Sequence, residues 1–107
     1  AFDMVAAAQK AQLTAFVADN ACVPWLVEWN KNISARLPCF PGVQGGLIES
    51  NGAENYGRWS QMLEQHPCAG AGWLAARDGA FHLDDDYWHR SGGILLDPRP
   101  YSDLLRT

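Results

Sequence analysis

The chain has 107 residues, of which 48% are hydrophobic and 19% charged, and its formal net charge is −4. This composition excludes an intrinsically disordered chain, and the absence of any lysine or arginine cluster argues against nucleic acid or an anionic membrane surface as a partner. The length predicts a single domain over residues 1–107 that can bury a hydrophobic core.

Neither a membrane span nor a secretion signal is indicated by the apolar residues of the sequence. No apolar run is long enough to cross a bilayer, and the first residues lack a basic segment followed by an apolar one. We therefore expect a soluble, cytoplasmic protein without a cofactor, although a secreted protein that has lost its leader would look the same. The three cysteines, Cys22, Cys39 and Cys68, form no CxxC pair, which favours reduced thiols.

Three helices are predicted in the first two thirds of the chain. Apolar residues recur at helical spacing over residues 2–18, which predicts one amphipathic helix. A second helix is predicted over residues 21–37, and a third from residue 50 or 51 to the residue before Pro67. The stripe that we expect the second helix to bury consists of Cys22, Trp25, Leu26, Trp29, Ile33 and Leu37.

The last third of the chain contains two glycine turns. Asp78-Gly79 between WLAAR and AFHL is a strong signal for a type I′ hairpin, which would place Arg77 opposite Ala80. If Gly92-Gly93 forms a second turn, residues 93–97 become the third strand of an antiparallel meander. The predicted fold is therefore α+β, with about three N-terminal helices packed on one face of a C-terminal three-stranded antiparallel sheet.

Strand alternation would gather aromatic and acidic side chains on the other face of this sheet. The expected members of that face include Trp73, His82, Asp84, Asp86, Trp88 and Asp97. Three consecutive aspartates are poor strand formers, so we also expect a bulge or a break at residues 84–86 that decides where Trp88 faces.

The first functional hypothesis is a non-catalytic binding or oligomerising protein that uses this acidic, tryptophan-bearing face. Tryptophan together with carboxylates suits a basic protein, a small cationic ligand or a second copy of the chain. Self-association as a homodimer or binding of another protein is therefore the expected partnership.

The second hypothesis is a thiol hydrolase or acyltransferase. Cys22 lies near a predicted helix N-terminus, which lowers a thiol pKa, and His82 and Asp97 follow in the order Cys, His, Asp. The stretch from His82 to Pro100 resembles, over fewer than 20 residues, the histidine and Asp-Pro strands of transglutaminase-like and papain-like folds. A turn at Gly92-Gly93 would, however, leave Asp97 about 20 Å from His82 along the strand.

The third hypothesis is a divalent-metal site at His82, Asp84 and Asp86, which alternate onto one side of the predicted strand. Hard divalent ions take such oxygen ligands, and the histidine would admit zinc or manganese. Same-face neighbours on a strand lie about 7 Å apart, so these ligands would need a bulge to converge. A solvated acidic edge that prevents strand pairing explains the same residues.

Overall fold

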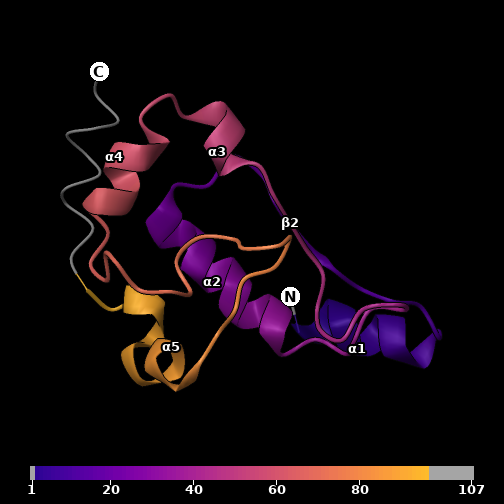
Figure 1. Cartoon of the computed structure of the whole chain (residues 1–107). Coiled ribbons are helices and arrows are strands. Elements are labelled where there is room, and N and C mark those ends of the chain that lie inside the picture. Colours follow the sequence, from indigo (N-terminus) through magenta and orange to yellow (C-terminus); the bar gives the residue numbers. More distant parts are fainter. Residues whose placement is uncertain (1, 97–107) are drawn as a thin grey trace.

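The structure is a computed structural model that describes residues 2–96, and Figure 1 shows the course of the chain. In chain order the described elements are α1 (Phe2–Lys10), β1 (Val17–Asp19), α2 (Pro24–Ala35), β2 (Ile48–Ser50), α3 (Gly52–Asn55), α4 (Trp59–Glu64), α5 (Asp85–Arg90) and the 3₁₀ turn η1 (Ser91–Gly93). In that part of the chain, no helix has both the length and the apolar character needed to cross a membrane.

The organising unit is a βαβ arrangement in the N-terminal half. Strands β1 and β2 pair in parallel, with Val17 opposite Ile48 and Asp19 opposite Ser50. Two parallel strands cannot be joined by a tight turn, and α2 provides the long crossover that they require. Helix α2 packs against both strands, so it lies at the centre of the molecule (Figure 1).

The predicted C-terminal meander is wrong. Within residues 72–96, strand pairing is limited to one isolated bridge between Arg77 and Ala80. The predicted Asp78-Gly79 turn is confirmed, because both residues have positive φ, 53° and 76°, and the flanking residues exchange backbone hydrogen bonds of 2.8 and 3.0 Å. The ladder does not extend beyond this turn, and the only sheet in the described residues is the parallel pair of β1 and β2.

The three aspartates begin a helix where the meander required a strand. The Asp84 carboxylate accepts a 3.0 Å hydrogen bond from the backbone N–H of Tyr87, which makes Asp84 the N-cap of α5. Asp85 and Asp86 occupy the first turn and His89 and Arg90 the last, so charges at both ends complement the helix dipole. The expected break at residues 84–86 is therefore a change from extended chain to helix.

The other predicted helices differ in length from those observed. The first was predicted over residues 2–18 but ends at Lys10, and Gln12, two residues later, has a positive φ of 58°. The backbone N–H of Gln12 donates to the Gln9 carbonyl, and the backbone N–H of Leu13 donates to the Ala8 carbonyl. These are the hydrogen bonds of a Schellman cap. The third predicted helix is divided into α3 and α4.

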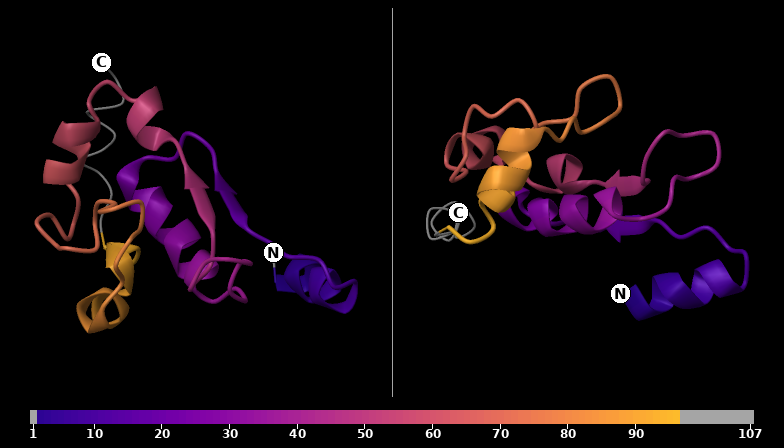
Figure 2. Two further views of the ribbon diagram at one scale, coloured as in Figure 1. Left: turned by 45° about the vertical axis from the view of Figure 1, so that its right-hand side comes forward. Right: turned by 90° about the horizontal axis from the view of Figure 1, so that it is seen from below.

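Helix α1 stands apart from the rest of the molecule. Figure 2 shows it at one end, joined to β1 by a stretch of chain, and separated from α2 in both views. The principal extents of 44 × 28 × 26 Å reflect this elongated shape. Helix α1 therefore contributes little to the core in a single copy.

The main core lies between α2, α5 and the loop that follows α4. Trp73 and Tyr87 are fully buried there, and their rings pack edge to face with centroids 5.1 Å apart. Cys68 and Leu74 complete this cluster, while Val23 and Met62 form a smaller one. The core is thus built around aromatic residues that the predicted sheet would have placed elsewhere.

Candidate functional site

Helix α2 has its charged face turned inward and an apolar face turned outward. Glu28 and Lys31 are only 1% and 2% exposed, whereas Leu26 is 41% and Trp29 46% exposed. The prediction that Leu26 and Trp29 lie in a buried stripe is wrong. The reason is that the charged side chains find specific partners inside the molecule.

Lys31 makes three of these internal contacts. Its Nζ donates to Glu28 Oε1 at 2.8 Å and to the backbone carbonyls of Trp73 and Leu74, both at 3.0 Å. These three acceptors use all three ammonium N–H groups, which is what a buried lysine requires. The ring of Phe81 lies 4.1 Å from Nζ and adds a cation–π contact. The lysine therefore fastens α2 to the loop that carries Trp73.

The Glu28 side chain is as deeply buried as that of Lys31, but its hydrogen bonds are less complete. Its Oε2 atom is buried without a hydrogen-bond partner among the described residues. Burial raises the pKa of Glu28 to about 7, against the attraction of Lys31, which lowers it. A Cβ added at Gly92 would lie 3.0 Å from the Glu28 Cβ and 3.2 Å from Oε2. The backbone of η1 thus closes directly over this carboxylate.

His66, which directly precedes Pro67, lies in the same cluster. The side chain is buried, and Nδ1 accepts a 2.9 Å hydrogen bond from the backbone N–H of Cys68. Nε2 lies 3.7 Å from Glu28 Oε1. Burial, together with the positive charge of Lys31, lowers the pKa of His66 to about 4. At neutral pH this histidine is therefore uncharged.

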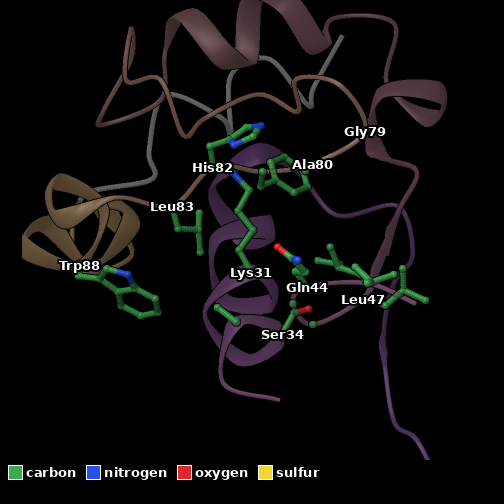
Figure 3. A pocket seen from close by; sticks show the side chains of 15 residues that line it. Lys31, Ser34, Gln44, Leu47, Gly79, Ala80, His82, Leu83 and Trp88 are labelled. Atoms are coloured by element: carbon green, nitrogen blue, oxygen red, sulfur yellow. The ribbon is translucent and has the colours of Figure 1, made fainter. Parts of the chain in front are cut away.

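A groove of about 760 Å³ lies beside this cluster. Its walls come from the second half of α2, residues 43–48, the hairpin loop 79–83 and Trp88 of α5. Figure 3 shows Lys31 extending from α2 toward Ala80 and His82, with Trp88 on another side of the groove. The Lys31 ammonium is already fully bonded, so it offers no free donor to an anionic ligand.

Most of the acidic and aromatic residues singled out from the sequence hold the fold together. The Trp73 indole N–H donates to Asp86 at 2.9 Å, and the same carboxylate oxygen accepts from Arg90. Trp88 is 40% exposed, with the Arg36 guanidinium 5.0 Å from its ring centre. Asp97 lies outside the described residues. The structure thus places Trp73 in the core and Trp88 at the surface, on no common sheet face.

The environment of Cys22 does not favour a thiolate. Cys22 is half-buried just before α2, and burial together with the nearby Asp19 carboxylate raises its thiol pKa. The exposed His82 lies at the groove, with its Nε2 3.2 Å from the carbonyl oxygen of Arg77. Cys22 is absent from the residues that line that groove.

The metal hypothesis likewise gains no geometric support. Over residues 2–96, no group of three or more histidine, cysteine, aspartate or glutamate side chains is arranged to hold a metal ion. His82 contacts the Arg77 carbonyl, Asp84 caps α5, and Asp86 accepts from Trp73. These side chains serve separate local contacts and do not converge.

The candidate site is the outward apolar face of α2. The exposed Leu26 and Trp29 and the half-buried Ile33 stand three and four residues apart along the helix, and we call them the outer stripe of α2. Clustered exposed aromatic and aliphatic side chains mark sites of protein interaction. The sequence pattern identified these residues as one apolar stripe, but nothing local showed that the stripe faces outward.

The whole chain was also compared with known proteins. No model of a protein family, no curated protein and no solved structure matched it. The functional conclusion therefore rests on the geometry described above.

Proposed function

We propose that this chain is a non-catalytic interaction domain that self-associates through the outer stripe of α2. The observation that carries the proposal is the orientation of α2, which buries Glu28 and Lys31 while Leu26 and Trp29 stay exposed. Burying two charges in a core is costly unless they are paired. The molecule meets that condition and still leaves Leu26 and Trp29 of α2 exposed.

Association would remove this apolar surface from water. Tryptophan is the residue type most often found at the energetic centre of protein interfaces, and Trp29 lies in the middle of the stripe. A second copy is the partner that we favour, because closed symmetric dimers are the commonest form of association.

A comparison of three proteins by light scattering at rising concentration tests this proposal. The original chain should have twice its 11.8 kDa mass. A Trp29→Glu variant should stay at the single-chain mass, because a carboxylate in an apolar contact cannot be solvated. Trp88→Glu is the matched control, since Trp88 is also exposed but lies on α5, and this variant should remain dimeric.

Two outcomes would contradict the proposal. One is an original chain that stays monomeric at every concentration. The other is equal dissociation by the Trp29 and Trp88 variants, which would remove the special role of the stripe. Circular dichroism of each variant would establish that the helices are retained.

A further inference from the structure

We propose that helix α1 of a second copy covers the outer stripe of α2, so that two copies exchange their N-terminal helices. This inference rests on the proposed self-association and identifies the segment that makes the contact. Three observations support it: the open face of α1, the match in shape between the two helices, and the position of α1 at the end of a separate arm.

The first observation is that a single copy leaves the apolar face of α1 partly open, with Val5 and Ala8 half-buried and Met4 exposed. Met4 is 77% exposed, and Val5 and Ala8 lie on the same side of the helix. Asp3 and Lys10 lie on another side. An isolated helix of nine residues is marginal in water, so α1 needs a packing partner to stay helical.

The second observation is the complementary size of the side chains. On α1 the small side chains of Ala7 and Ala8 lie beside Met4, three and four residues further along the helix, and they let another helix approach closely. The outer stripe of α2 offers the bulky side chains of Leu26, Trp29 and Ile33. Large residues on one helix facing small residues on the other fill the space between two helices.

The lengths of the two helices also match. Nine residues give α1 a length of about 14 Å, and the stripe from Leu26 to Ile33 spans about 10 Å along α2. Helix α1 can therefore cover the stripe completely while its ends extend beyond it.

The third observation is the position of α1. In both views of Figure 2 it lies away from its own α2, at the end of the connecting chain that leads to β1. The Schellman cap at Gln12 ends the helix, and the chain then continues to β1. An element held away from its own body on a connector is the arrangement from which domain exchange between identical chains arises.

The two methionines of the chain provide a direct test. Met4 is exposed on α1, whereas Met62 is 1% exposed in the core, so it is a built-in control. Both methionines can be replaced by the photoreactive analogue photo-methionine. Labelled and unlabelled copies of the full chain, one of them enriched in ¹⁵N, are mixed and irradiated, and mass spectrometry then identifies crosslinks between copies.

The proposal predicts crosslinks from Met4 of one copy to the α2 peptide of the other, and none between copies from Met62. If the chain dimerises but Met4 reaches only other peptides, the helix exchange is wrong and the proposed self-association stands. If no dimer forms, both proposals fail. The outcomes are therefore distinguishable.

Substitution on α1 gives a second readout. Met4→Glu places a charge on the exchanging face and should weaken the dimer at least tenfold. Ala6→Glu adds the same charge about 160° around α1 from Met4 and should leave the dissociation constant unchanged. A Met4→Glu dimer as tight as that of the original chain would overturn the exchange. Because α1 lies outside the core, neither change should unfold the body of the protein.

Discussion

The Glu28 carboxylate lies 2.8 Å from the Lys31 ammonium, and both side chains are only 1% exposed. This pair fixes the rotation of α2, because the partners of Lys31 lie in the loop at Trp73 and Leu74. With the charged face held inward, the apolar stripe is on the outside. The proposed function therefore depends on a buried ion pair.

Our first prediction concerns the pH dependence of stability in this cluster. Burial lowers the folded pKa of His66 from 6.5 to about 4, so the unfolded chain binds a proton first as the pH falls. His66 therefore contributes stability above pH 6.5 that is lost as the pH falls to 4. A shift of this size corresponds to about 3 kcal/mol.

Glu28 should act in the opposite direction. Its folded pKa is raised from 4.5 to about 7, so the folded state keeps a proton that the unfolded chain releases, and stability falls as the pH rises through this range. Urea unfolding of the original chain, His66→Gln and Glu28→Gln from pH 4 to 7.5 checks both signs. Relative to His66→Gln the original chain should gain stability with rising pH, and relative to Glu28→Gln it should lose stability. If the differences in the free energy of unfolding between the original chain and both variants did not change with pH, His66 and Glu28 would not be buried as described.

The second prediction concerns the closure of η1 over Glu28. Gly92 has a φ of +62°, and an added Cβ would lie 2.8 Å from the Tyr87 ring and 3.0 Å from the Glu28 Cβ. Gly79 also has a positive φ, but an added Cβ there meets nothing within 4 Å, and Gly57 has neither constraint. Thermal unfolding should rank the alanine variants accordingly. Gly57→Ala should be near neutral, Gly79→Ala should cost about 1 kcal/mol, and Gly92→Ala should cost more than about 2 kcal/mol.

A Gly92→Ala variant no less stable than Gly79→Ala would mean that η1 does not pack against Tyr87 and Glu28. Gly57→Ala serves as the control for the general effect of a methyl group on the unfolded chain.

The third prediction concerns Asp84, which the sequence suggested as a binding or metal-ligating residue. Because its carboxylate caps α5, Asp84→Ala should lower the free energy of unfolding by about 1 kcal/mol, while Asp84→Asn should retain most of the stability. Asp85→Ala, one residue further into the helix, is the control for loss of charge. Chemical denaturation distinguishes these variants. Equal losses for Asp84→Ala and Asp84→Asn would indicate that charge, and not capping, is what matters.

Local signals in the sequence were sufficient for some features of the fold. The type I′ turn at Asp78-Gly79 followed from the preference of those residues for positive φ, and the central helix followed from spacing and from Pro24 in its first turn. Such features depend on a few neighbouring residues, so a single sequence reveals them.

The start of α5 could also have been found. An aspartate N-cap, two acidic residues in the first turn and two basic residues in the last turn are a helix signature. Glycine turns at residues 78–79 and 92–93 flank this segment and also fit a meander, which is the fold that the sequence analysis predicts. The core residue Tyr87 was missed for the same reason.

The rotation of α2 could not have been predicted from local pattern. Apolar periodicity finds the two faces of a helix but assumes that the apolar face is buried. Here Lys31 donates to the carbonyls of Trp73 and Leu74, more than 40 residues away in the chain, and Glu28 is paired with Lys31. Such long-range hydrogen bonds leave no signal near α2, and the exposed stripe depends on them.

Fluorine NMR of the chain labelled with 5-fluorotryptophan tests the central claim most directly, because Trp29 reports on the stripe itself. The resonances are assigned by single Trp→Phe variants. On dilution the Trp29 resonance should shift as the dimer dissociates, while those of the buried Trp73 and of Trp88 on α5 should stay in place. A Trp29 resonance that does not change at any concentration would contradict self-association through the outer stripe of α2.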